Sequence, residues 1–456
     1  MDKTLDFLSR YAIGLKYGDL PANAVHQVKR RVIDTLGCAV AGFAEEPARI
    51  ARSYALEVRA SPGATLIGTR HRTAPDLAAF ANGVAFRCTD FSDTGLAIDP
   101  GHPSDNIAPV LAAAEYASAG VKALITGIVL AYEIQGRFGE VGYFGRRGWD
   151  HATMVAMSSA LGAGKALGLN QEQMANALAL AAVANNTLRQ IRVGGLSMWK
   201  GAAAGNASRN GVFVALLAGR GMTGPAEAFE GKQGFFNVVT GGVLKFPPFG
   251  GKGRTFKVED AKFKYYPCDY EGQCAVGPTI ELHRLIEGKV GAIDKLVVHT
   301  YEHAVNVTAD NRDKWNPKTR ETADHSLPYV LAVALSKGNI WLDDFSSERI
   351  QDRGIHALMQ KIEVYAAEEY TSRYPEANGF RLELTMRSGE KFVKEILYGK
   401  GHPKNPMTDK EIEAKFRRLA EPSIGPRRAT SILNRLWHLE EIEDVRQIAR
   451  LFVLPS

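Results

Sequence analysis

The sequence predicts a mainly α protein, with a large all-helical domain and a smaller α+β lid domain. Three observations support this prediction. Apolar residues recur at intervals of three and four from residue 3 to about residue 240. Strand-like runs follow only after a segment rich in Pro and Gly at 245–257, and the helical pattern returns near the C-terminus. The 456 residues are also enough for two hydrophobic cores.

Amphipathic patterns fill the first half of the chain. They cover 24–43, 76–91, 106–120, 125–139, 154–169, 174–184 and 206–221. Several of them are rich in Ala, Gly and Ser, as at Ser158, Gly162 and Gly164. Small side chains let helix backbones approach closely, so we interpret these residues as packing positions in a compact bundle.

A different pattern begins after the Pro/Gly segment. The runs 293–301, 361–367 and 380–398 read as strands, and the last of them is a hairpin around Ser388-Gly389. A helix from about 326 to 336 lies between them. The segment 265–400 is therefore the predicted α+β domain.

The C-terminal segment is expected to return to the helical domain. Thr408 is a candidate N-cap, and Glu411, three residues later, completes a capping box. The predicted helical domain thus combines 1–264 with 401–456.

Composition excludes several classes of function. The net charge of +6 comes from 56 basic and 50 acidic residues without a long basic run, so we expect no nucleic-acid partner. The most apolar stretches are too short to cross a bilayer, and the N-terminus has no signal-peptide core, so we expect a cytoplasmic protein without a membrane partner. The four cysteines match no common zinc or iron–sulfur spacing. Reduced thiols are the expectation.

The stretch GHPSDN at 101–106 precedes an apolar helical run. Asp105 or Asn106 could cap a helix that begins near Ile107, and Pro109 would fall in its first turn. A cap does not require His102. A helix N-terminus attracts anions and histidine titrates near neutral pH, so His102 is a candidate for proton transfer on a carboxylate substrate.

Further candidates stand at the starts of other predicted helices. His151 precedes the Ala-rich run at 154–169, Lys200 opens another helix, and Tyr329 begins the helix near 326. Each has a structural alternative: a histidine fixed at a helix start, a solvated lysine, or a tyrosine packed on a helix. Together they point to a site for acid–base chemistry.

Eight motifs, in order and spacing, make the chain resemble the MmgE/PrpD family. They are DTLGCAVAG (34–42), TDFSDT (89–94), GHPSDN (101–106), HATMVAMSSALGAGKALGL (151–169), KGAAAGNASRNG (200–211), YYPCDYEGQ (265–273), TADHSLPYVLAVAL (322–335) and NPMTDKEIEAKF (405–416). The resemblance covers almost the whole chain. The family includes 2-methylcitrate dehydratase, cis-aconitate decarboxylase and other enzymes of small polycarboxylates.

This resemblance implies both an architecture and a set of site residues. It implies a helical domain built from both chain ends, a smaller lid, a cleft between them and a homodimer. The active-site positions carried over by motif are Asp90, Thr94, His102, His151, Lys200 and Tyr329.

One turn distinguishes the branches of the family. Decarboxylase-like members commonly have a histidine after the YP dipeptide, where this chain has Gln273, and GHPSDN also resembles the dehydratase form. Both features favour a dehydratase, with Gln273 as a substrate-binding residue. Asp269, Tyr270 and Glu271 depart from the dehydratase pattern in the same turn, so the identity of the polycarboxylate stays open.

The resulting hypothesis is a hydro-lyase that uses side chains alone, with no cofactor and no metal. His102 and His151 divide the proton transfers, Asp90 orients and charges one imidazole, and Lys200 with helix N-termini holds carboxylates. Tyr329 completes the site when the lid closes.

Four alternatives remain at this stage. The same pocket could decarboxylate an aconitate-like acid or epimerise an amino-dicarboxylate, and the chain could be a non-catalytic carboxylate-binding protein. A metal hydrolase is disfavoured because neither His102 nor His151 belongs to an HxH or HxxxH pair.

Overall fold

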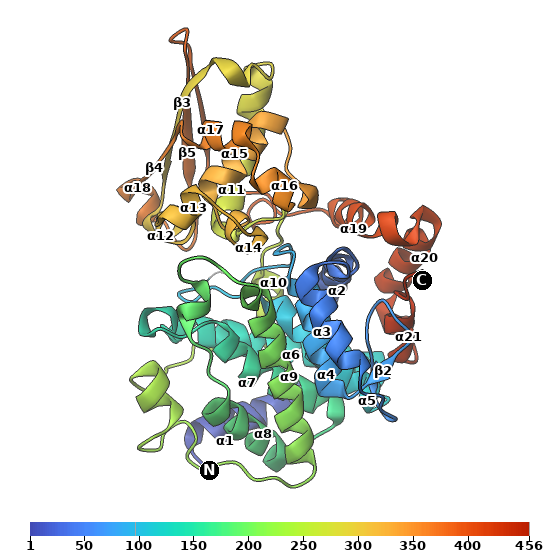
Figure 1. Cartoon of the computed structure of the whole chain (residues 1–456). Coiled ribbons are helices and arrows are strands. Elements are labelled where there is room, and N and C mark those ends of the chain that lie inside the picture. Colours follow the sequence, from blue (N-terminus) through green and yellow to red (C-terminus); the bar gives the residue numbers. More distant parts are fainter. Residues whose placement is uncertain (96, 456) are drawn as a thin grey trace. The chain divides into compact units, whose positions relative to one another are not determined.

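The computed structural model describes residues 1–95 and 97–455 and divides them into two compact units. Unit 1 comprises Met1–Ile191, Gly201–Ala261 and Thr408–Ser456, and unit 2 comprises Arg192–Lys200 and Lys262–Met407. The prediction of a mainly α protein with a smaller α+β part is confirmed (Figure 1). In the described residues, no helix is both long enough and apolar enough to cross a membrane.

Unit 1 is helical apart from two short strands, β1 (Ala64–Thr65) and β2 (Arg72–Thr73). Its longer helices are α1 (Lys3–Gly14), α2 (Ala22–Gly42), α3 (Glu46–Leu56), α4 (Pro75–Arg87), α5 (Ile107–Tyr116), α6 (Val121–Val141), α7 (Ala152–Leu167), α8 (Gln171–Ala184), α9 (Trp199–Gly219), α19 (Asp409–Ile424) and α20 (Pro426–Trp437). Its short helices are η1 (Tyr17–Asp19), η2 (Pro103–Asn106), η3 (Gly145–Arg147), η5 (Phe236–Thr240), α10 (Lys257–Asp260), η8 (Leu439–Glu441) and α21 (Arg446–Arg450). Helix α9 starts in unit 2, with Trp199 and Lys200, and η4 (Arg189–Arg192) ends there.

Small residues allow the central helices of unit 1 to pack closely. A Cβ added to Gly127 of α6 would lie 2.9 Å from the carbonyl oxygen of Gly162 in α7, and one added to Gly162 would lie 3.0 Å from the oxygen of Gly127. Either substitution would push the two backbones apart. This close approach confirms a packing role for Gly162.

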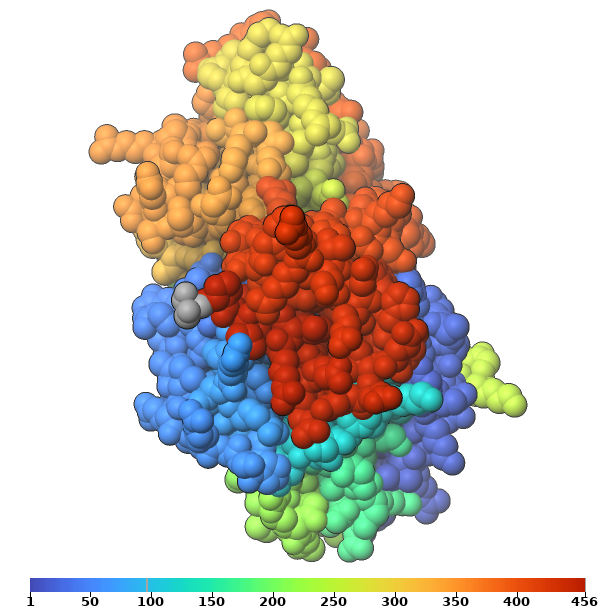
Figure 2. Space-filling model, turned by 90° about the vertical axis from the view of Figure 1, so that its right-hand side faces the viewer, coloured from blue at the N-terminus to red at the C-terminus, as the bar shows by residue number. Residues whose placement is uncertain are grey.

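The C-terminal segment belongs to unit 1. Helix α19 packs against α2, and Figure 2 shows this segment in red, beside the blue N-terminal helices. Thr408 caps α19: its hydroxyl accepts from the Glu411 backbone N–H, and the Glu411 carboxylate accepts from the Thr408 N–H at 2.7 Å. The predicted capping box is confirmed.

Unit 2 is built on a four-stranded mixed sheet with strand order β4-β3-β5-β6. The strands are β3 (Ile293–Thr300), β4 (Ile362–Ala366), β5 (Phe380–Met386) and β6 (Lys391–Ile396). Strand β3 is parallel to β4 and antiparallel to β5, which pairs antiparallel with β6. Alternate residues of β5 are buried, from Phe380 to Met386, so one face of the strand meets the core. The predicted strands and hairpin are confirmed.

Helices α11 (Tyr270–Leu285) and α15 (Leu327–Lys337) pack together in unit 2, and α11 lies against β5 and β6. The remaining helices are η6 (Val290–Ala292), α12 (Glu302–Thr308), α13 (Arg312–Trp315), α14 (Arg320–Ala323), η7 (Leu342–Phe345), α16 (Ser347–Ile350), α17 (Arg353–Met359) and α18 (Glu368–Thr371). All four cysteines of the chain are buried thiols, as expected.

Candidate functional site

His102 lies in unit 1, at the start of η2, where the chain turns into α5. Its Nδ1 is 2.8 Å from the backbone oxygen of Asp93, and its Nε2 is 2.7 Å from a guanidinium nitrogen of Arg87. Arg87 is the last residue of α4 and also pairs with the buried Asp90. One guanidinium therefore joins Asp90 to His102.

Asp90 has a left-handed backbone conformation, with φ of +50°. Few non-glycine residues adopt this region, and Asp is among those that tolerate it best. Asp90 lies three residues beyond the end of α4, and its carboxylate pairs with Arg87, the last residue of that helix. Thr94 lies in the same loop, and its hydroxyl donates to the carbonyl oxygen of Gly101 at 3.1 Å.

His151 precedes α7, and its ring centroid is 5.2 Å from that of His102, with the rings at 74°. Its Nδ1 lies 3.5 Å from an Asp150 carboxylate oxygen, and its Nε2 lies 3.6 Å from an Asp105 carboxylate oxygen. Both distances suit ion pairs when the imidazole is protonated. Among the described residues, neither His151 Nε2 nor Asp105 Oδ2 has a hydrogen-bond partner, although both atoms are buried.

We call the five residues His102, His151, Arg87, Asp90 and Asp93 the histidine cluster. The N-terminal ends of η2 and α7 both lie in it, and backbone N–H groups there favour anions. Two imidazoles beside two helix starts can move protons on a carboxylate compound.

The prediction that Asp105 or Asn106 caps α5 is wrong. Within the described chain, neither Asp105 nor Asn106 makes a side-chain cap bond to this helix. The Asn106 amide instead donates to Gln135 Oε1 at 2.6 Å, and its oxygen accepts from the hydroxyls of Ser158 and Ser159 at 2.7 and 3.1 Å. Asn106 therefore connects the segment after His102 to α6 and α7. Its oxygen is the acceptor for two buried hydroxyls of α7, and buried hydroxyls are nearly always hydrogen-bonded.

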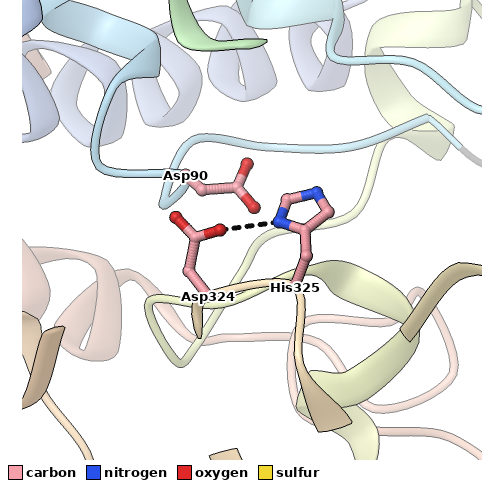
Figure 3. A group of neighbouring side chains, drawn as sticks. All are labelled: Asp90, Asp324 and His325. Carbon is pink, nitrogen blue, oxygen red and sulfur yellow. Dashed lines mark hydrogen bonds and ion pairs between the residues drawn. The ribbon is translucent and has the colours of Figure 1, made fainter. Parts of the chain in front are cut away.

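Lys200 stands in the first turn of α9 and is buried in unit 2. Its Nζ lies 2.9 Å from Asp324 Oδ1, and the same oxygen accepts from His325 Nδ1 at 2.6 Å (Figure 3). His325 Nε2 in turn lies 3.3 Å from Asp269 Oδ2. We call these four residues, Lys200, Asp324, His325 and Asp269, the lysine cluster.

A further buried lysine lies beside this cluster. Burial lowers the pKa of Lys314, and the neighbouring Lys200 also lowers it, whereas Asp269 raises it. Lys262 and Lys264 are buried elsewhere in the same unit, where their charges act on Glu271. Lys314 therefore adds a positive charge beside the lysine cluster, which suits a carboxylate ligand.

Gln273 and Tyr329 are both bonded to backbone groups of unit 2. The Gln273 amide oxygen accepts from the backbone N–H groups of Tyr265 and Tyr266 at 2.9 and 3.3 Å, so it shapes its own turn. The Tyr329 hydroxyl donates to the backbone oxygen of Asp344 at 2.5 Å, and burial raises its pKa above the usual range. The structure gives neither of them a hydrogen bond or ion pair to the lysine cluster within the described residues.

Sequence reasoning overlooked Arg87, Asp324 and His325 as site residues. Arg87 precedes Asp90 by three residues at the end of a helix, a spacing that brings two side chains together. Asp324 and His325 form the dipeptide that precedes the predicted helix of Tyr329. Both patterns are visible in the sequence, but neither of them shows which distant residue the side chain contacts.

The fold and the histidine cluster define a class: a mainly α protein of two units with buried groups for proton transfer. Comparison with known families gives the particular one. The model of the MmgE/PrpD N-terminal domain matches residues 6–246, and that of the MmgE/PrpD C-terminal domain matches residues 266–439. The chain belongs to the MmgE/PrpD family.

Several relatives are similar over most of their length. A 2-methylcitrate dehydratase of Salmonella typhimurium is 32% identical over 399 residues, covering 81% of this chain and 80% of the relative. A mitochondrial 2-methylcitrate dehydratase of Yarrowia lipolytica is 31% identical, covering 81% and 75%. The cis-aconitate decarboxylase of Homo sapiens is 27% identical, covering 97% and 93%.

Proposed function

We propose that this chain is a hydro-lyase that dehydrates a small hydroxy polycarboxylate, most like 2-methylcitrate, to the unsaturated acid 2-methyl-cis-aconitate. One observation carries the proposal: the imidazoles of His102 and His151 lie 5.2 Å apart at helix starts, and His151 has a buried ring nitrogen without a hydrogen-bond partner among the described residues. The relatives named 2-methylcitrate dehydratase support this choice of substrate.

Dehydration needs a base for the α-proton and an acid for the departing hydroxide. We assign His102 as the base, because its Nε2 already acts as an acceptor towards Arg87. We assign His151 as the acid, because both of its nitrogens face carboxylate oxygens, which only an N–H can satisfy. His102 takes the α-proton, the C–O bond breaks as the double bond forms, and the hydroxide leaves as water with the proton of His151.

The remaining predicted residues have supporting roles in this proposal. Asp90 balances the charge of Arg87 beside the base, and Lys200 holds a substrate carboxylate. Thr94 and Gln273 shape binding turns through their backbone bonds. Tyr329 is a donor in the scheme only if its hydroxyl leaves Asp344, and a variant described below tests this role.

The proposal is tested by incubating the purified protein with 2-methylcitrate, citrate and cis-aconitate. We expect absorbance from a new conjugated double bond with 2-methylcitrate, and water elimination seen by proton NMR. Stabilisation by these acids without turnover would instead favour a non-catalytic binding protein. The proposal names no cofactor and no metal, so activity should survive exhaustive chelation.

The second candidate is decarboxylation of a cis-aconitate-like acid. The human relative named cis-aconitate decarboxylase covers 97% of this chain, which favours keeping it. Release of CO₂ from cis-aconitate, without dehydration of 2-methylcitrate, would select this reaction. Inversion of an amino-dicarboxylate without loss of water or CO₂ would select epimerisation.

We infer further that the protein is a cytoplasmic homodimer of propionate metabolism. Apolar side chains exposed on unit 1, including Leu188 and Val243, support an association of this kind. Light scattering should give twice the chain mass of 49.6 kDa, and a single chain mass would contradict the dimer. Loss of growth on propionate after deletion of the gene in its own host tests the pathway, and cell fractionation tests the location.

A further inference from the structure

Asp93 makes two separate connections to the segment that carries His102. Its backbone oxygen lies 2.8 Å from His102 Nδ1, and its carboxylate Oδ1 accepts from the backbone N–H of Ser104 at 2.9 Å. The first contact orients the ring, and the second fixes the backbone two residues beyond it. Asp93 therefore holds both the ring of His102 and the segment behind it.

The surrounding bonds select one tautomer of His102. A carbonyl oxygen can only accept, so Nδ1 must carry the hydrogen that points to Asp93. A guanidinium can only donate, so Nε2 must present its lone pair to Arg87. The two contacts agree on the Nδ1–H form, with Nε2 as the basic nitrogen.

The carboxylate of Asp93 is itself held from two helices. Its Oδ2 accepts from the hydroxyl of Tyr132 in α6 at 2.8 Å and lies 3.8 Å from Arg31 Nε of α2. Burial and the nearby Asp93 raise the pKa of Tyr132, so this hydroxyl keeps its proton and remains a donor. Asp93 is buried, and a buried carboxylate requires such partners.

The loop that bears Asp93 is also held from the C-terminal segment. Lys415 of α19 donates to the backbone oxygen of Phe91 at 2.7 Å and pairs with Asp34 at 2.6 Å. The titratable and charged groups around Asp93 and His102 are Arg31 and Asp34 of α2, Arg87 of α4, Asp90, Asp105, Tyr132 of α6, His151 and Lys415. Asp34 shares this network, but its ion pair is with Lys415 rather than with the His102 segment.

We propose that Asp93 is a positioning residue that holds His102 as the Nδ1–H tautomer, with the lone pair of Nε2 directed at Arg87 until the substrate displaces this contact. This rests on the proposed function only where it assigns the base, because the tautomer is a property of the resting protein. Asp93 does not touch the reacting atoms in this scheme. It acts through the imidazole of His102, which does touch them.

The experiment compares wild type with Asp93→Asn, using histidine labelled with ¹⁵N and His102→Gln to assign the signals. Wild type should show a protonated Nδ1 and an unprotonated Nε2 at His102. Asp93→Asn keeps the backbone oxygen but weakens the hold of the side chain on Ser104 and Arg31, so the oxygen should move away from Nδ1. The two tautomers should then mix, and kcat should fall on the order of 10²-fold while KM changes little, because a wrongly protonated imidazole cannot act as base. The acidic limb of the pH–rate profile, which reports the base, should move with it.

Asp34→Asn is the matched control, since it also removes a buried carboxylate from the network. It should leave the tautomer of His102 unchanged. If Asp93→Asn does not fold, Tyr132→Phe carries the test: it removes one hydrogen bond from Asp93 and should shift the tautomer in part, with a smaller fall in kcat.

Three results would overturn the proposal. They are a protonated Nε2 in wild type, an unchanged tautomer in folded Asp93→Asn, and an unchanged tautomer and rate in Tyr132→Phe when Asp93→Asn does not fold. Failure of the proposed function is distinguishable, because the ¹⁵N signals do not depend on turnover. A chain that dehydrates nothing but shows the expected tautomer shift keeps Asp93 as a positioning residue and loses only the assigned reaction.

Discussion

His151 of the histidine cluster and the residues of the lysine cluster differ in how closely they are paired. In the described part of unit 1, the buried Nε2 of His151 has no hydrogen-bond partner, and the ion pairs of this ring with Asp105 and Asp150 are 3.6 and 3.5 Å long. In unit 2, Lys200, Asp324, His325 and Asp269 form a continuous chain of ion pairs, each within 3.3 Å. The imidazole of His151 is therefore held more loosely than the charged groups of the lysine cluster.

This difference indicates a division of work. An unpaired buried polar group costs about 1–3 kcal/mol, so such groups persist where a ligand pairs with them. A buried ion-pair chain mostly fixes geometry, and its loss exposes the remaining charges. We therefore expect substitution of His102 or His151 to remove activity with little change in stability. Substitutions in the lysine cluster should affect both.

The largest effect is expected from His102→Gln and His151→Gln. Each should reduce kcat for dehydration by about 10²- to 10⁴-fold, because each removes one of the two proton-transfer groups. Thermal unfolding should change little. His26→Gln is the matched control, since His26 is exposed and pairs with Asp409 elsewhere in unit 1, and it should leave kcat unaltered. Near-normal turnover in His102→Gln or His151→Gln would contradict the catalytic role assigned to that histidine.

Lys200→Met should lower both activity and stability. It leaves the buried Asp324 without its lysine, and removing one partner of a buried pair costs about 3–5 kcal/mol. The double variant Lys200→Met/Asp324→Asn should recover part of the free energy of unfolding, but none of the activity. Chemical denaturation of the single and double variants measures this coupling. Additive losses would show that the two residues do not act as a pair.

The helical scaffold was largely predictable because its signals are local. The pattern at 76–91 corresponds to α4 (Pro75–Arg87), and Thr408 with Glu411 marks the start of α19. The abundance of Ala, Gly and Ser in α7 also predicted the close approach at Gly162. These features depend on neighbours within about one or two helical turns, which the sequence displays directly.

The partners inside the clusters were not predictable in the same way. Asn106 has the sequence position of a cap, but Ser158 and Ser159, some fifty residues later, compete for its oxygen. Arg87 contacts His102, fifteen residues later in the chain, and the left-handed conformation of Asp90 lies between them. The ion pair between His325 and Asp269 joins two residues that are more than fifty positions apart in the sequence. Tertiary packing decides these partners, and no local pattern specifies them.

Unit 2 also contains a buried carboxyl that should make its stability depend on pH. Burial, assisted by the negative charge of Asp269, raises the pKa of Glu271 to about 7, and Tyr301 donates to its carboxyl. The folded pKa lies above the ordinary value of 4.5, so the folded form binds the proton more tightly than the unfolded form. The stabilisation is complete below the ordinary pKa and is lost as the pH rises through about 7.

Glu271→Gln tests this dependence by mimicking the neutral acid. Between about pH 5 and about pH 8, wild type should lose stability relative to Glu271→Gln by on the order of 3 kcal/mol. Denaturant unfolding at several pH values measures the difference. Glu287→Gln, which changes an exposed carboxylate in the same unit, should leave the slope unaltered. If the free energy of unfolding changes with pH in the same way in wild type and in Glu271→Gln, the titrating group is not Glu271.

The smallest effect is expected from Tyr329→Phe, which decides whether this hydroxyl acts in catalysis or only in packing. The hydroxyl donates to the Asp344 backbone oxygen at 2.5 Å, so its removal leaves a buried carbonyl with one bond fewer and should cost about 1 kcal/mol of unfolding free energy. We expect kcat to fall less than about tenfold, below the range of a proton-transfer group. Steady-state kinetics and denaturation on the same preparation separate the two roles. A loss of about 10²-fold or more in kcat, with unchanged stability, would make Tyr329 a third proton-transfer residue and would place acid–base chemistry in unit 2 as well.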